Sequence, residues 1–134
     1  MRAVLDVNVL VSALLAPTGT PARLLIAWQD GRFELVVSPG LLAELERALT
    51  YPKLRKRIEP EEAEAFVAWL SRSADLVPDP DVAPAVRSVD PGDDYLIALA
   101  ADQDAVLVSG DHDLLDLASV LPILDPATFI SRLP

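Results

Sequence analysis

The sequence contains no cysteine and only one histidine, His112. The absence of cysteine excludes disulfide bonds, thiolate metal sites and a cysteine nucleophile. A single histidine excludes a catalytic zinc site built from two or three imidazoles. His112 itself lies in a turn-like segment, where a lone histidine is more often solvated than bound to a ligand.

Basic residues are scarce, and lysine occurs only at Lys53 and Lys56. Against 11 basic residues stand 21 acidic ones, which gives a net charge of −10 and an isoelectric point of about 4.3. A simple nucleic-acid binder is usually basic, because it must neutralise phosphates. The charge therefore argues against a passive binder, but not against a nuclease whose acidic residues hold metal ions.

No uncharged apolar run is long enough to span a membrane, since the longest covers residues 7–16 and is interrupted by Asn8 and Ser12. No signal-peptide charge pattern precedes it. We therefore expect a soluble, cytoplasmic protein. With 134 residues, of which 51% are hydrophobic and 24% charged, the chain is expected to form one globular domain over residues 1–134.

Short apolar runs predict strands at residues 2–7, 33–37, 75–77, 105–109 and 122–124. Helical patterns separate them, and two helix starts combine a hydroxyl cap with proline: Thr20 before Pro21, and Ser38 before Pro39. Residues 78–92 are rich in proline and predict a loop. Alternating strands and helices predict an α/β fold, a three-layer α/β/α sandwich with a central parallel sheet of four or five strands.

Several acids fall where such folds bind ligands, beyond the carboxyl ends of the strands. Asp6 ends the first strand, and Asp111 follows the strand at 105–109. Asp111 can also be read as a turn residue. Asp6 is harder to explain structurally, because a carboxylate at the end of an apolar strand is costly to desolvate unless it has a partner.

Two further acidic positions stay ambiguous on pattern alone. Asp93 and Asp94 open the helix after the proline-rich loop, and either can be a cap or a first-turn acid. In the helix after Pro39, Glu44 and Glu46 flank the apolar face by similar angles, so helical periodicity does not choose between them.

Clustered carboxylates without nearby bases repel one another, and a divalent cation removes that repulsion. Oxygen ligands suit Mg²⁺ or Mn²⁺. Such ions activate water and stabilise charge on a phosphoryl group. The acids therefore indicate metal-dependent chemistry on a phosphate ester.

Four segments, in this order, resemble the motifs of PIN-domain ribonucleases. They are residues 4–12, which contain Leu5-Asp6-Val7-Asn8; residues 36–45, which contain Ala43-Glu44-Leu45; residues 90–100, which begin Asp90-Pro91-Gly92-Asp93; and residues 106–115, which contain Ser109-Gly110-Asp111. Each motif alone is weak, but the four together cover nearly the whole chain. The subgroup that they resemble most is the VapC-like toxins of toxin–antitoxin pairs.

The resemblance implies a Mg²⁺- or Mn²⁺-dependent endoribonuclease that hydrolyses phosphodiester bonds of RNA. It places the catalytic acids at Asp6, Glu44, Asp93 and Asp111, of which Asp6, Asp93 and Asp111 are metal ligands. The spacing from Asp90 favours Asp93 over Asp94. The positions with supporting roles, or alternative acids, are Asn8, Ser12, Ser109, Asp94 and Asp113.

The resemblance also implies a small antitoxin partner and a homodimer. The one dense basic stretch, Lys53, Arg55, Lys56 and Arg57, can either contact RNA phosphates or form a solvated helix end. A PIN fold that no longer cleaves and serves as an interaction module is the alternative. A phosphoacceptor receiver domain is disfavoured, because such domains resemble one another in a late lysine and no lysine follows Lys56.

Overall fold

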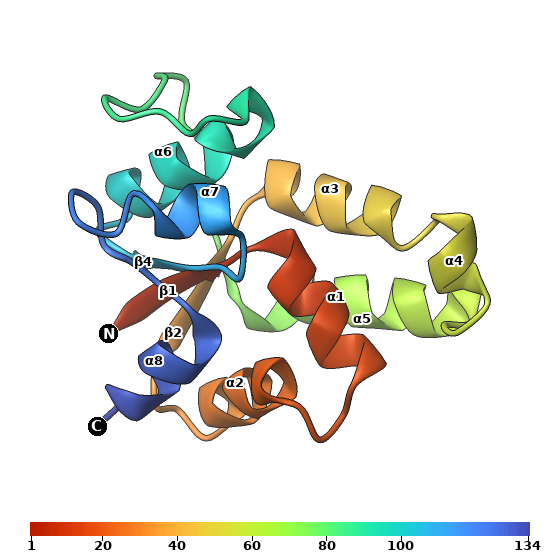
Figure 1. Ribbon diagram of the computed structural model, residues 1–134. Helices are drawn as coiled ribbons and strands as arrows, with labels where there is room; N and C mark the ends of the chain where they lie inside the picture. The colour runs from red at the N-terminus through yellow and green to blue at the C-terminus, as the bar shows by residue number, and fades with distance from the viewer.

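Five short strands pair in parallel to form one sheet, in the order β3-β2-β1-β4-β5. The computed structural model describes residues 1–134 (Figure 1). The strands are β1 Arg2–Leu5, β2 Glu34–Val37, β3 Asp75–Leu76, β4 Val106–Val108 and β5 Ile123–Leu124. The predicted α/β fold with a parallel sheet is therefore confirmed, and each strand is shorter than its apolar run predicted.

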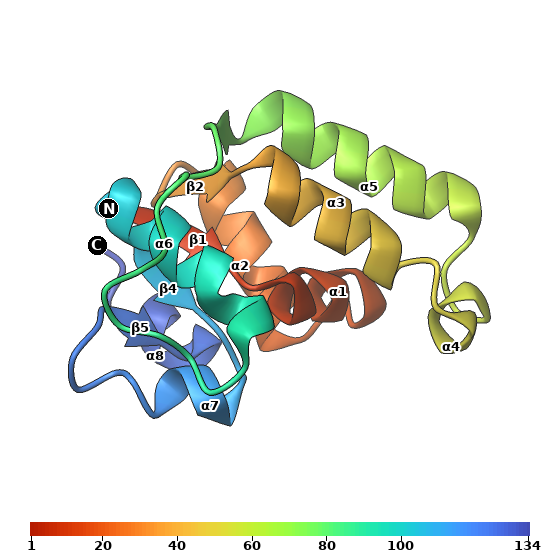
Figure 2. The same cartoon turned by 90° about the horizontal axis from the view of Figure 1, so that it is seen from above.

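Helices flank the sheet on both sides. They are α1 Val7–Leu15, α2 Thr20–Gln29, α3 Pro39–Ala48, α4 Pro52–Arg55, α5 Pro60–Ser73, α6 Asp94–Asp102, α7 His112–Leu115 and α8 Pro126–Ser131, with a 3₁₀ turn at Pro91–Asp93. In Figure 1, α6 lies above the strands, whereas α2 and α8 lie below them. In both views α3 and α5 run side by side away from the sheet, with α4 at their far end (Figure 2).

The helix starts show which local signals the chain uses. Ser38 caps α3 as predicted, because its hydroxyl accepts a hydrogen bond from the Leu41 N–H at 3.2 Å. The prediction that Thr20 caps α2 is wrong. Gly19 occupies the cap position without a side-chain bond, and Thr20 is already helical. Proline at the second helical position serves as well as at the first, since neither N–H has an intrahelical partner.

The central strand anchors the hydrophobic core. Ala3, Val4 and Leu5 of β1 are completely buried, as expected for a parallel strand covered on both faces. They belong to one cluster of 34 buried apolar residues. Phe33, just before β2, and Phe129 of α8 pack edge to face, with ring centroids 5.1 Å apart. This contact fixes the last helix against the sheet.

No single helix is long and apolar enough to cross a membrane. Only α1 and α2 taken together reach that length and composition, and they are bent by 97° at their junction.

The proline-rich loop is tied to the helices at both of its ends. At its start, Asp79 Oδ2 accepts a hydrogen bond of 2.8 Å from the Gly40 N–H, in the first turn of α3. At its end, Asp94 Oδ1 accepts one of 2.9 Å from the Ser88 N–H. A Cβ at Gly40 would lie only 2.8 Å from Asp79 Oδ1, so the Asp79 carboxylate would have to shift if a larger residue replaced this glycine. The loop is thus held between α3 and α6.

Replacing Gly40 by alanine should displace the Asp79 carboxylate, which costs about 1 kcal/mol, the typical value of one hydrogen bond. Alanine in place of glycine within α3 gains about as much in helix propensity, so the tie is measured by the coupling between Gly40 and Asp79 and not by the single variant. Gly110→Ala is the matched control, because a Cβ at Gly110 meets no atom within 4 Å. Urea denaturation of Gly40→Ala, Asp79→Ala and the double variant forms a cycle. The two changes should cost little more together than either one alone, and simple additivity would contradict the tie.

Candidate active site

The strand order creates a crevice at the carboxyl ends of β1 and β4. From β1 the chain continues toward β2 on one side, and from β4 it continues toward β5 on the other, so the connections diverge between these two neighbours. Open parallel sheets bind ligands at such a switch point. Leu5 is aligned with Val108, so the next residues, Asp6 and Ser109, stand level at the mouth of the crevice.

Asp6 is a buried carboxylate with two donors of its own. The residue is only 5% exposed. The Ser109 hydroxyl donates to Asp6 Oδ2 at 2.7 Å, and the Asn8 backbone N–H approaches Oδ1 at 3.4 Å. Burial raises the pKa of Asp6 above its usual value, and these two donors oppose that rise. Ser109 therefore helps Asp6 to stay ionised in a desolvated position.

Ser109 also joins Asp6 to the loop that carries Asp111. Its hydroxyl oxygen accepts a hydrogen bond from the Asp111 N–H at 3.0 Å, while its proton goes to Asp6. Asp111 in turn caps α7, since its Oδ1 accepts from the Asp113 N–H at 3.0 Å. Asp113 thus contributes its backbone to this arrangement. The sequence alone also allows Asp111 to be a turn residue, and the structure shows it at the cap of a short helix beside Ser109.

Asp93 brings a third carboxylate to the crevice. Its Oδ2 atom is buried and has no hydrogen-bond partner. Burial, together with the negative charges of Asp6, Asp90 and Asp111, raises the pKa of Asp93 to about 6. An oxygen that is buried, unpaired and surrounded by like charge is a poor structural element. It is well suited to binding a cation.

The adjacent Asp94 has a different environment. Its Oδ1 accepts from the Ser88 N–H at 2.9 Å, and its Oδ2 lies 3.6 Å from Arg87 Nη1. The carboxylate of Asp94 is thus used to close the proline-rich loop, whereas that of Asp93 faces the other acids. This difference favours Asp93 as the candidate ligand.

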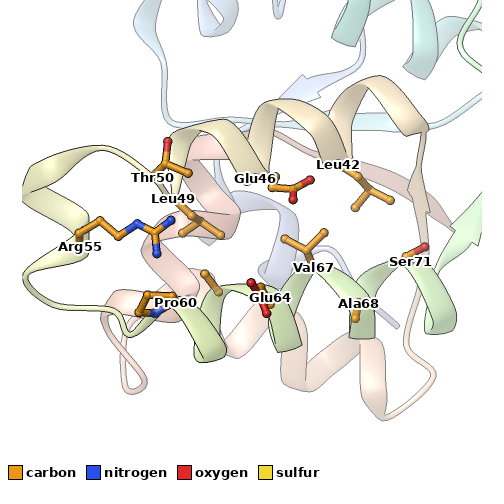
Figure 3. A pocket seen from close by; sticks show the side chains of 11 residues that line it. Leu42, Glu46, Leu49, Thr50, Arg55, Pro60, Glu64, Val67, Ala68 and Ser71 are labelled. Atoms are coloured by element: carbon orange, nitrogen blue, oxygen red, sulfur yellow. The ribbon is translucent and has the colours of Figure 1, made fainter.

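The two glutamates that periodicity left open lie on different sides of α3. The pKa of Tyr95 is raised by burial and then by the charges of Glu44, Asp6 and Asp93. Tyr95 therefore lies near these three carboxylates. Glu46 instead points into the cleft between α3 and α5, opposite Glu64 (Figure 3). Glu44 is therefore the glutamate on the side of the crevice, where Arg47 holds it at 2.6 Å.

Asn8 and Ser12 lie one turn apart on the exposed face of α1. They line a cavity of about 350 Å³ together with Gly110 and Asp111. Small polar side chains therefore border the crevice on one side. Arg2 is the basic residue nearest to Asp6 in the sequence. It lies at the amino end of β1, away from the crevice, and forms ion pairs with Glu34 and Asp75.

The donor set fits a hard divalent cation, although the spacing does not form a finished site. All candidate ligands are carboxylates, the type that Mg²⁺ and Mn²⁺ prefer. The unpaired Oδ2 of Asp93 supplies a ready ligand. No three Asp, Glu or His side chains converge closely enough to form a metal site as they stand. Mutual repulsion of the carboxylates opposes closer approach.

Sequence reasoning did not single out Tyr95. Only its position next to Asp93 and Asp94 could have drawn attention to it. The contribution of Asp79 was also missed, because its bond to Gly40 spans 39 residues and leaves no local pattern.

Fold and crevice together define a class: an α/β protein with carboxylates at the switch point of a parallel sheet. The model of the PIN domain matches residues 2–113, so the chain belongs to the PIN-domain family. Members of this family are typically metal-dependent nucleases.

Among curated proteins, the uncharacterized protein MJ1680 of Methanocaldococcus jannaschii is 29% identical over 117 residues, which cover 87% of this chain and 75% of that protein.

Solved structures share the fold at low sequence identity. PAE2754 from Pyrobaculum aerophilum superposes with a TM-score of 0.71 at 21% identity, covering 98% of this chain and 94% of that one. VapBC2 from Rickettsia felis, bound to a DNA fragment from their promoter, gives 0.66 at 13%, with 93% and 98% covered. FitAcB from Neisseria gonorrhoeae gives 0.57 at 18%, also with 93% and 98% covered.

Asp93→Asn should stabilise the metal-free protein above pH 6. The pKa of Asp93 is about 6 in the folded chain and about 3.9 for an unfolded aspartate. Between these values the native state keeps a proton that the unfolded state releases, so stability falls as pH rises. Because the group is partly exposed, solvent screening limits the gain to about 1 kcal/mol, or roughly 3 °C in Tm.

The gain should disappear below about pH 4, where both states of the wild type are protonated. Asp116→Asn is the control, because it makes the same charge change at an exposed residue without a side-chain hydrogen bond or ion pair. Thermal melts in EDTA across the pH range measure both. If the Tm of Asp93→Asn stays at or below that of the wild type above pH 6, the claim that the ionised Asp93 carboxylate destabilises the metal-free protein is wrong.

Proposed function

We propose that this protein is a metal-dependent endoribonuclease that hydrolyses phosphodiester bonds of RNA. The observation that carries the proposal is that Asp6, Asp93 and Asp111, from three distant parts of the chain, border one crevice, where burial and then the charges of the other acids raise the pKa of Asp93. One of their oxygens is buried without a partner. Such strain is not expected in a purely structural site, and a bound cation would relieve it.

In this proposal Asp6, Asp93 and Asp111 hold Mg²⁺ or Mn²⁺, with Glu44 beside them. When bound, such an ion lowers the pKa of a water molecule and stabilises charge on the phosphate. Ser109 helps to keep Asp6 ionised and connects it to the Asp111 backbone. Glu44 accepts a proton from, and orients, the attacking water.

In-line attack at phosphorus breaks the bond to the 3′-oxygen, and the resemblance to PIN ribonucleases implies 5′-phosphate and 3′-hydroxyl ends. Protons compete with the cation for Asp93, whose pKa is about 6 in the metal-free chain, so more Mg²⁺ or Mn²⁺ should be needed for activity below pH 6 than above it. The phenol of Tyr95 remains protonated, because burial and the surrounding acids raise its pKa. It can therefore donate a hydrogen bond within the crevice.

We further propose that the chain is the toxin of a toxin–antitoxin pair and acts in the cytoplasm as a homodimer. The motif resemblance to VapC-like toxins and the shared fold with VapBC2 and FitAcB support this role. The net charge of −10 suits a partner with a basic segment. The alternative is an inactive PIN-fold interaction module, which need not bind divalent ions with useful affinity.

Cleavage of single-stranded RNA should stop in EDTA and return when Mg²⁺ or Mn²⁺ is added. Asp6→Asn should reduce the rate by at least about 10²-fold, because it removes a charged ligand. Asp116→Asn again serves as the control and should keep the wild-type rate. RNA cleavage that survives both EDTA and Asp6→Asn would rule out the metal mechanism.

Added Mn²⁺ should raise the Tm more above pH 6 than below it, because protons compete with the cation for Asp93 and Asp6. At roughly 100 times its dissociation constant, a ligand adds about 2.7 kcal/mol of stability. Asp93→Asn should lose most of this gain. An absent Mn²⁺-induced shift would favour the inactive module, whereas a shift that is equal on both sides of pH 6 would show that Mn²⁺ binds away from Asp93 and would contradict the proposed ligands.

A further inference from the structure

A second cavity continues from the carboxylate crevice along α1. The cavity at Asp111, of about 350 Å³, is lined by Asn8 and Ser12. A cavity of about 510 Å³ is lined by the same two residues and by Tyr51, Lys53 and Arg57. Because the two cavities share Asn8 and Ser12, they adjoin at the exposed face of α1. The two cavities together are here named the α1 groove.

The α1 groove changes in charge from one end to the other. Asp111 stands at the crevice end. At the far end lie Lys53 and Arg57, and neither forms an ion pair in the structure. In both views α1 runs from the sheet toward α4 (Figure 1, Figure 2). From Asn8 to Leu15 this helix spans about 10 Å.

The basic stretch is thereby divided into two pairs. Lys53 and Arg57 line the α1 groove. Arg55 lines the separate cleft between α3 and α5 (Figure 3), and Lys56 lines neither cavity. Tyr51 adds an aromatic ring that is 46% exposed at the groove wall. Tyr51 is the residue before α4, and its hydroxyl makes no capping bond to that helix.

We infer that the α1 groove is the path of single-stranded RNA to the carboxylate crevice, an assignment that rests on the proposed function. Lys53 and Arg57 bind backbone phosphates, and the amide of Asn8 and the hydroxyl of Ser12 hydrogen-bond to phosphate or sugar. Tyr51 stacks on a base. The phosphate to be cleaved enters the crevice beside Asp111. A passage that places cations away from the acids explains how a chain of charge −10 can bind RNA.

The test compares two double variants with the same change in net charge, Lys53→Ala/Arg57→Ala and Arg55→Ala/Lys56→Ala. All four side chains are exposed, so both variants should fold, which circular dichroism checks. The probe is a fluorescein-labelled, mixed-sequence single-stranded RNA, and its duplex form is the comparison. Anisotropy with Mg²⁺ in an Asp6→Asn background measures binding without cleavage.

The groove variant should bind the single strand about tenfold more weakly, and its salt slope should fall by about 1.4, or roughly 0.7 for each lost phosphate contact. The control pair should stay within about twofold of its parent. Tyr51→Ala should weaken binding by about tenfold, whereas Tyr51→Phe keeps the ring and should not. The assignment of the α1 groove as the RNA path would be overturned if both double variants lost affinity equally, if neither lost affinity, or if the duplex bound more tightly than the single strand.

Cleavage by the otherwise wild-type protein separates this inference from the proposed function. Groove substitutions should raise KM and leave kcat nearly unchanged, because they lie away from the reacting phosphate. Cleavage with an unaltered KM in the groove variant would refute the groove and leave the nuclease assignment intact. Groove-dependent binding without any cleavage in Mg²⁺ or Mn²⁺ would refute the nuclease assignment and leave the groove as a binding surface.

Discussion

The hydrogen bond from Ser109 to Asp6 joins the ends of β1 and β4, and the rest of the crevice is built on it. At 2.7 Å it stabilises a carboxylate in the core of an otherwise apolar sheet. The same hydroxyl accepts from the Asp111 N–H. One serine hydroxyl therefore connects two acids at the ends of paired strands, and it bonds to Asp6 across 103 residues of sequence. Without this bond Asp6 would be buried with little compensation, and Asp111 would lose its link to the sheet.

The remaining acids accumulate strain around that bond. Asp93 carries a buried oxygen without a partner, and burial together with the neighbouring acids raises its pKa to about 6. Strain of this kind weakens the folded state, so it persists where function requires it. The ties at Asp79 and Asp94 hold the proline-rich loop that ends at Asp93. Asp93 and Asp94 are thus adjacent in the chain but differ in their partners: Asp94 accepts a hydrogen bond from the loop, whereas one oxygen of Asp93 has none.

The fold was largely predictable, because five short apolar runs alternate with helical patterns along the chain. Asp6 shows the limit: the first strand was predicted to reach residue 7, but Asp6 turns the chain into α1. Helical periodicity could not choose between Glu44 and Glu46, since only the position of α5 shows which one the cleft receives. The division of the basic stretch into two pairs and the place of Tyr95 also depend on tertiary packing, which leaves no signal at short range.

The most direct test of the central claim is a crystal structure of the protein soaked with Mn²⁺, with the ion located by its anomalous scattering. The account predicts a peak in the crevice, coordinated by Asp93 Oδ2 and by oxygens of Asp6 and Asp111, with these side chains drawn closer together. Ordered carboxylates with no Mn²⁺ among them, or an ion held only elsewhere on the surface, would contradict it.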